Sequence, residues 1–206
     1  MLTKKQLKIL EPMTKDLFRE YMYKELKSLS HEKSGNGFQL ALNKFKEENL
    51  ITERRIGTSA LLKANLQNEL LYNYISIINL NKLPKKQLET VHMLKNEIEK
   101  DVLFYSLVVF GSHADNTQTS KSDLDMAIFV ANKEKETEIK IAINTIKKMS
   151  LIEMDCHIIT EGEFLDMLSA DYTNVGKLMA TKNLPLINAG IFYKLLSKGV
   201  EHGFKH

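Results

Sequence analysis

Two stretches decide the fold: LFYSLVVFGS at residues 103–112 and, after an interval of ten residues, DLDMAIFV at residues 123–130. The first is an apolar run rich in valine, leucine and aromatic residues, and it ends at Gly-Ser. It therefore predicts a largely buried strand followed by a sharp turn. The second also predicts a strand, but this strand begins with two acidic residues, Asp123 and Asp125.

Asp123 and Asp125 are predicted to project from the same face of their strand, because side chains in a strand repeat every two residues. Leu124 and Met126 then point into the core. Two like charges this close repel each other unless both face water or a divalent cation lies between them. The pair is therefore a candidate metal site, and two solvated acids in a surface hairpin are the alternative.

The Gly111-Ser112 turn is a candidate phosphate-binding element. Glycine lets the backbone approach a ligand closely, and Ser112 can present an amide and a hydroxyl to a phosphate, especially if a helix begins there. A phosphate site beside paired carboxylates is typical of Mg²⁺-assisted phosphoryl or nucleotidyl transfer.

The spacing from Gly111-Ser112 to Asp123-Leu124-Asp125 resembles the signature of the DNA polymerase beta superfamily, in the form typical of its minimal nucleotidyltransferases. Members of this superfamily usually carry a third carboxylate on a neighbouring strand.

A candidate for the third carboxylate lies in LIEMDCHII at residues 151–159. This segment alternates like a strand, with Glu153, Asp155 and His157 on the face opposite its apolar side chains. Asp155 is the predicted match, and His157 is expected to lie outside the metal site.

The resemblance implies an α/β (α+β) nucleotidyltransferase fold with a mixed sheet. It also implies Mg²⁺-dependent transfer of an NMP from an NTP, with ATP as the expected donor, to an acceptor hydroxyl. Asp123, Asp125 and Asp155 would be the catalytic and metal-binding residues. The nucleotide-binding residues would be Gly111, Ser112, Lys121 and Ser122.

The acceptor stays open at this point. It is a protein hydroxyl, as in minimal nucleotidyltransferases that act as antitoxins by modifying a partner toxin, or a nucleic acid, or a small molecule such as an aminoglycoside.

The loop between Ser112 and Asp123 departs from the family pattern. Many members carry arginine at the positions of His113 or Asp115, where the charge reaches the triphosphate. Here His113 either donates a hydrogen bond to phosphate or is solvated in the loop. Lys177 and Lys182 follow the core where relatives often place a basic residue, although an exposed helix face also explains them.

The first part of the chain predicts three helices and a basic hairpin. Thr3 caps a first helix, a second runs from about Lys15 to Leu29, and a third runs from about Phe38 to Asn49. LITERRI at residues 50–56 and ALLKANL at residues 60–66 predict two strands around a turn. This order resembles a winged helix-turn-helix.

A winged helix implies DNA binding, with the third helix in the major groove and the hairpin at the backbone or the minor groove. Residues 1–82 carry 14 Lys and Arg against 9 Asp and Glu, whereas the remainder carries 15 against 17. Winged helices also serve as protein-binding modules, and Glu47, Glu48 and Glu53 argue against a strongly basic surface. The predicted DNA-binding residues are Gln39, Asn43, Lys44, Lys46, Arg54 and Arg55.

Two further helices, over residues 67–80 and 84–100, are separated by LNKLP at residues 80–84, where the pattern breaks. We therefore predict a winged helix-turn-helix domain with its trailing helix over residues 1–82 and a nucleotidyltransferase domain over residues 83–206. The helix at 67–80 either pairs with its copy in a homodimer or packs within one chain. Later elements are predicted as a helix over 132–149, another beginning at 161, and helix, extended turn and terminal helix over 172–204.

The composition fits a globular protein, with 43% hydrophobic and 27% charged residues. No stretch approaches the roughly 20 apolar residues that cross a bilayer, and the N-terminus lacks an apolar signal core. The protein is therefore expected to be cytoplasmic, without a membrane partner. The single Cys156 excludes an internal disulfide and a cysteine-based zinc site, and we predict a buried structural thiol.

Two functions from different classes are consistent with these patterns. The leading hypothesis is an Mg²⁺-dependent nucleotidyltransferase that carries a DNA-binding domain. The alternative is a DNA-binding transcriptional regulator whose transferase fold senses nucleotide or is inactive.

Overall fold

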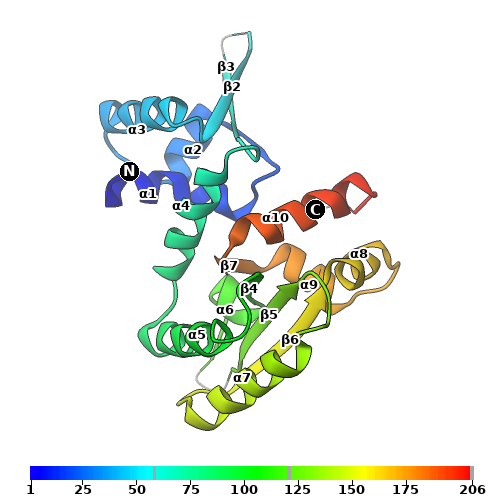
Figure 1. Ribbon diagram of the computed structural model, residues 1–206. Helices are drawn as coiled ribbons and strands as arrows, with labels where there is room; N and C mark the ends of the chain where they lie inside the picture. The colour runs from blue at the N-terminus through cyan, green and yellow to red at the C-terminus, as the bar shows by residue number, and fades with distance from the viewer. Residues whose placement is uncertain (58, 120–121, 205–206) are drawn as a thin grey trace. The chain divides into compact units, whose positions relative to one another are not determined.

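The computed structural model describes residues 1–57, 59–119 and 122–204, and its contacts divide the chain into two compact units, Met1–Ile78 and Asn79–His206 (Figure 1). The division falls inside helix α4 (Glu69–Leu80), slightly before the boundary predicted after residue 82.

Unit 1 begins with a helix, continues with a short strand and two helices, and ends its core with a hairpin. The hairpin strands β2 and β3 pair with each other, and β1 pairs with the other side of β3, so the antiparallel sheet has the order β1-β3-β2. The elements are α1 (Lys4–Leu10), the 3₁₀ helix η1 (Glu11–Lys15), β1 (Glu20–Met22), α2 (Tyr23–Leu29), α3 (Gly35–Glu47), β2 (Ile51–Ile56) and β3 (Ser59–Ala64).

Side-chain caps set the starts of α1 and α3. Thr3 accepts the backbone N–H of Gln6 at 3.3 Å, which confirms the predicted cap. Ser34 accepts the N–H of Gly37 at 3.0 Å, so α3 begins before the predicted start at Phe38. Phe38 and Phe45 are both fully buried on the inner face of α3.

The prediction of one helix from Lys15 to Leu29 is wrong, because this segment contains β1 as well as α2. The carboxylate of Asp16 accepts the N–H groups of Phe18 and Arg19 at 3.0 and 3.2 Å, which turns the chain out of a helix. The segment then pairs with β3, with Tyr21 opposite Leu62. Pairing with a distant strand overrides the local periodicity.

Unit 2 is built on a four-stranded mixed sheet with the order β6-β5-β4-β7. β4 is antiparallel to β5 and to β7, whereas β5 and β6 are parallel and are joined through α7. The mixed sheet is as predicted. The strands are β4 (Tyr105–Phe110), β5 (Leu124–Val130), β6 (Met154–Thr160) and β7 (Asn183–Ile187), and the helices are α5 (Lys85–Ile98), α6 (Ser112–Asp115), α7 (Glu136–Met149), α8 (Glu161–Ser169), α9 (Val175–Thr181) and α10 (Ala189–Glu201).

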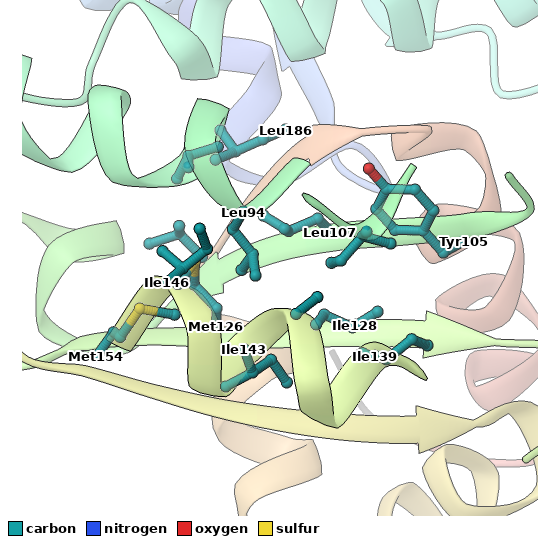
Figure 2. Close-up of a cluster of buried hydrophobic side chains, with 14 of the residues drawn as sticks. Leu94, Tyr105, Leu107, Met126, Ile128, Ile139, Ile143, Ile146, Met154 and Leu186 are labelled. Atoms are coloured by element: carbon teal, nitrogen blue, oxygen red, sulfur yellow. The ribbon is translucent and has the colours of Figure 1, made fainter. Parts of the chain in front are cut away.

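Helices α5 and α7 cover one face of this sheet (Figure 2). Leu94 of α5 and Ile143 of α7 join Leu107, Met126 and Ile128 of the central strands in one buried apolar cluster. Because side chains alternate along a strand, Asp125 belongs to the opposite face.

The opposite face packs through aromatic rings. Phe129 of β5 lies 5.0 Å from Phe164 of α8 and 5.5 Å from Phe192 of α10, measured between ring centroids. All three rings are at most 2% exposed. This packing anchors β5 at the end that is distant from Asp125.

Strand β7 corrects the prediction of an extended turn over residues 184–190. Pro185 lies within β7, opposite Val108 of β4, and β7 is an edge strand. Proline is tolerated on an edge because its missing N–H is not needed by a neighbouring strand. Pro185 is the reason that the sequence did not predict a strand for this segment.

No helix within the described ranges combines the length and apolar character that a membrane span requires. Cys156 is partly buried, and burial raises the pKa of its thiol to about 12. At neutral pH this thiol is therefore protonated and a poor nucleophile.

Candidate active site

Gly111 joins β4 to α6 in a backbone conformation that other residues rarely adopt, with φ of +70° and ψ of −139°. A Cβ atom at this position would lie 2.9 Å from Oδ2 of Asp125, closer than such atoms approach. Glycine is therefore required here twice, once for the conformation and once to make room for the Asp125 carboxylate.

The β5–β6 pairing brings Asp125 and Asp155 together, because they are register partners in neighbouring parallel strands. Asp123 lies directly before β5 and is exposed, and Asp125 is half-buried. The side chain of Asp155 is 56% exposed, and its Oδ2 lies 3.3 Å from Nε2 of His157. The three predicted acids therefore gather at one end of β5 and β6.

The three carboxylates interact electrically. Burial is the main reason that the pKa of Asp125 is raised above its ordinary value, and the negative charges of Asp155 and Asp123 raise it further. The nearby imidazoles of His113 and His157 act in the opposite direction. Asp125 is therefore the centre of a crowded negative cluster that a bound cation would stabilise.

His113 is only 5% exposed, so the prediction that it is solvated in the loop is wrong. Its Nε2 lies 3.5 Å from the carbonyl oxygen of Ser122, and its buried Nδ1 has no hydrogen-bond partner within the described parts of the chain. His113 thus links the start of the loop to the residue that precedes Asp123.

The predicted nucleotide-binding residues lie around the same loop. Ser112 begins α6, and its carbonyl accepts the N–H of Thr117 at 3.0 Å. Ser122 accepts the N–H of Thr119 through its hydroxyl at 2.9 Å, which closes a turn before Asp123. Lys121 lies outside the described residues.

Lys182 lies beside the glycine turn, although its spacing in the sequence gave it little support. Its ammonium is 2.5 Å from Oδ2 of Asp115, and its carbonyl accepts the N–H of Gly111 at 3.2 Å. The hydrogen bond from Lys182 holds the pKa of Asp115 below its ordinary value. By contrast, Lys177 donates to the carbonyl of Ala170.

Residues 89–183 match the family model described as polymerase beta, nucleotidyltransferase. The matched segment contains Gly111, the three acids and Lys182, and it ends at the first residue of β7. The match therefore supports the superfamily for this segment. Searches of curated proteins and of solved structures found no significant match.

The donor set formed by Asp123, Asp125 and Asp155 suits Mg²⁺, because all three acids offer carboxylate oxygens. Among the described residues, no three His, Cys, Asp or Glu side chains are arranged to hold a metal by themselves. Mg²⁺ is commonly held by one or two carboxylates together with waters and substrate phosphates. The mutual repulsion at Asp125 and the closeness of Asp155 therefore fit an ion that arrives with the nucleotide.

The predicted DNA-binding residues lie on α3 and on the hairpin of unit 1. Gln39 donates to Asn43 at 3.0 Å, and every cation of the set lies next to a carboxylate. The pairs are Lys44 with Glu47 and Glu48, Lys46 with Glu53, Arg54 with Glu20, and Arg55 with Glu53. The carboxylates partly neutralise the surface that was predicted to meet DNA.

One feature of the sequence, the acid at position 115, pointed to the Lys182–Asp115 pair, but it is not part of any periodic pattern. An acid at a position where relatives carry arginine reverses the expected charge, and a compensating lysine must then be sought elsewhere. Only the fold shows which lysine it is, because β7 pairs with β4 and brings the preceding residue beside the turn.

We expect Gly111→Ala to destabilise unit 2 by about 1–3 kcal/mol, because the new Cβ is strained and meets the Asp125 carboxylate. Chemical denaturation would measure the change. Gly162→Ala, in a helical position of α8 with open space around it, is the matched control and should be neutral or stabilising by up to about 1 kcal/mol. Equal effects of both changes would contradict this account of Gly111.

We also expect Asp125→Asn to stabilise the metal-free protein increasingly as the pH rises. The folded protein raises the pKa of Asp125, so it holds this proton more tightly than the unfolded chain, in which the pKa is about 3.9. The wild type therefore loses stability as the pH rises from the unfolded value through the folded one. Denaturation in EDTA between about pH 3.5 and 7 measures this difference.

Asp171→Asn, at an exposed position outside the site, controls for the loss of one charge. A stability difference between wild type and Asp125→Asn that is the same at every pH would show that the folded protein does not raise the pKa of Asp125.

Proposed function

We propose that this protein is an Mg²⁺-dependent nucleotidyltransferase that moves an NMP from an NTP, with ATP as the expected donor, to an acceptor hydroxyl. The observation that carries the proposal is the contact between the Gly111 turn and Asp125, with Asp155 in register on the next strand. All of these residues lie in the segment that matches the nucleotidyltransferase family.

Each residue has a chemical role in this proposal. Asp123, Asp125 and Asp155 hold the cation. Asp155, the most exposed residue of β6, also accepts the proton of the acceptor hydroxyl. When bound, Mg²⁺ neutralises phosphate charge and lowers the pKa of the acceptor hydroxyl. Ser112 binds phosphate through its N–H and hydroxyl, whereas the N–H of Gly111 is already bonded to Lys182.

Lys182 supplies the positive charge that relatives place on arginine. Asp115 stands where many members of the family have arginine, and it holds the Lys182 ammonium beside the Gly111 turn. The Lys182 side chain is 46% exposed, so its ammonium can reach a triphosphate without leaving a buried site. Lys121 and Ser122 complete the proposed nucleotide site.

Calorimetry with each NTP, with and without Mg²⁺, tests the donor site. Lys182→Ala should weaken NTP binding by about tenfold to a hundredfold, as expected for the loss of a charged hydrogen bond. Lys177→Ala is the matched control, because it removes a lysine that is hydrogen-bonded to Ala170, and it should leave binding unchanged. Label transfer from α-labelled NTP should fall at least about a hundredfold in Asp125→Asn.

Absence of NTP binding under all conditions would reject the transferase proposal. It would favour the second candidate, a DNA-binding regulator with an inactive transferase fold.

We further propose that unit 1 binds DNA in the manner of a winged helix-turn-helix. The order helix, strand, two helices and hairpin, with β1 paired to β3, supports this proposal. The ion pairs on α3 and the hairpin are exposed, and such pairs contribute only about 0–1 kcal/mol each. DNA phosphates can therefore replace the carboxylate partners, at a DNA affinity reduced by this competition.

Replacing both Arg54 and Arg55 with alanine should weaken binding to a DNA duplex and reduce the salt dependence of binding by about one ion per residue. Fluorescence anisotropy at several salt concentrations measures both effects. Replacing Lys24 and Lys33, two exposed lysines outside α3 and the hairpin, is the charge-matched control. An equal loss of affinity in both double variants would reject a specific role for the hairpin.

A cytoplasmic location, where NTPs and DNA are both present, completes the proposal. A homodimer also belongs to it, but not one that uses the apolar stripe of α4, because Leu71, Tyr72 and Ile75 are buried within one chain.

A further inference from the structure

The outer edge of β6 is open. β6 is the last strand in the order β6-β5-β4-β7, so in the described part of the chain only β5 pairs with it. The N–H of Leu124 donates to the carbonyl of Glu153 at 2.9 Å, which fixes the alternation of the backbone groups. Cys156 and Ile158 therefore direct their N–H and C=O groups outward, where a further strand can pair with them.

The other edge of the same sheet is protected. On β7, Pro185 has no N–H to offer, and its carbonyl accepts the side-chain amide of Asn79 at 3.1 Å. Proline on an edge is a common means of preventing pairing with another chain. β6 contains no proline, so the β6 edge lacks the protection that Pro185 gives the β7 edge.

A groove of about 710 Å³ runs along the open edge. Four consecutive β6 residues, Cys156–Ile159, line it, with α7 on one side and α8 on the other (Figure 1). Apolar side chains of Ile143, Met167 and Val175 also contribute to its surface. The groove thus combines free backbone groups with apolar side chains, which are the features that bind an extended peptide.

The walls of the groove carry charges of both signs. On α7, Lys140 pairs with Glu136 at 2.6 Å, but Lys147 on the same face makes no ion pair with a described residue. On α8, Glu163 pairs with Lys133, whereas Asp166 makes none with the described residues. A polypeptide can offer one anion to Lys147 and one cation to Asp166. The groove carboxylates of Glu136, Glu163 and Asp166 would repel the phosphates of a nucleic acid.

We propose that an extended segment of a protein pairs with β6 as an added strand and presents a Ser, Thr or Tyr hydroxyl as the acceptor of the NMP. This inference rests on the proposed transferase function. A residue opposite Asp155 projects from the same sheet face as Asp155, with Cβ atoms about 4.5–5.5 Å apart. Because Asp155 is in register with Asp125, the hydroxyl arrives at the carboxylate cluster.

The reaction follows from this placement. The hydroxyl oxygen forms a bond to the α-phosphorus of the NTP, the bond from that phosphorus to the oxygen bridging to the β-phosphate breaks, and pyrophosphate leaves. The hydroxyl proton goes to Asp155. The products are an NMP diester on the protein segment and pyrophosphate.

Lys147 adds a preference within the segment. Lys147 of α7 and Cys156 of β6 both line the groove, so the Lys147 charge lies in the groove that contains the residue following Asp155. An acidic residue beside the acceptor hydroxyl is therefore favoured.

A phage library of random ten-residue linear peptides, selected on the full-length protein, tests the inference. Ile158→Pro removes one outward N–H of the edge and should lower the affinity of selected peptides about tenfold or more. Ile158→Val keeps this N–H and should bind like the wild type. N-methylation of the peptide backbone provides a second test that needs no protein variant, and NTP binding reports whether each variant is folded.

Selected peptides that contain an acceptor hydroxyl, respond to Ile158→Pro and to N-methylation, and become labelled from α-labelled NTP would support the inference. Failure to select such peptides while NTP binding is intact would overturn it and leave the transferase proposal standing. Peptides that bind to β6 without NTP binding or label transfer would instead count against the transferase, and with it the acceptor role. A dimer that Ile158→Pro dissociates would assign the groove to a second copy and overturn the inference.

Discussion

The crowding of the Asp125 carboxylate is the constraint on which the rest of unit 2 depends. This carboxylate is half-buried, faces Asp155 across a parallel pairing, and lies where any side chain on residue 111 would collide with it. Parallel pairing of consecutive strands requires a crossover connection, and α7 provides it. The same helix supplies Ile139 and Ile143 to the core that holds β5 in place (Figure 2).

In the loop after the glycine turn, Asp115 stands where many family members carry arginine, and its charge is balanced by Lys182. Asp115 adds a further negative charge to this loop, and the Lys182 ammonium neutralises it at 2.5 Å. Because the same residue accepts the Gly111 N–H through its carbonyl, the lysine and the turn are held together at two points. The buried imidazole of His113 acts to lower the pKa of Asp125, against the effect of burial. These contacts place the Lys182 ammonium, paired with Asp115, beside the Gly111 turn although the family arginine is absent.

The elements with regular apolar patterns were predictable from the sequence. β4, β5 and β6 were each expected from alternation or an apolar run, and the two-residue spacing of Asp123 and Asp125 correctly predicted that Met126 lies in the core. The register of Asp125 with Asp155 follows from a tertiary pairing and required the structure.

Two segments could not be predicted because distant contacts decide them. β1 forms against β3 in a stretch whose apolar spacing favoured a helix, and β7 contains a proline that argues against a strand unless it lies on an edge. The burial of His113 was also missed, and its Nε2 lies 3.5 Å from the carbonyl oxygen of Ser122 at the other end of the loop. For the two strands, a residue far along the chain overrides the local signal.

The position of the third acid has a consequence for the whole sheet. Asp155 reaches the cluster only because β6 pairs with β5, and β6 then has no further partner in the described sheet. An open edge invites pairing with other chains, and proteins usually blunt such edges with proline or charge. Here the proline lies on β7, while the outward backbone groups of β6 stay accessible beside the acid that is proposed to take the acceptor proton. The geometry that assembles the carboxylates therefore also leaves a strand-binding edge next to them, which links the acceptor site to the fold itself.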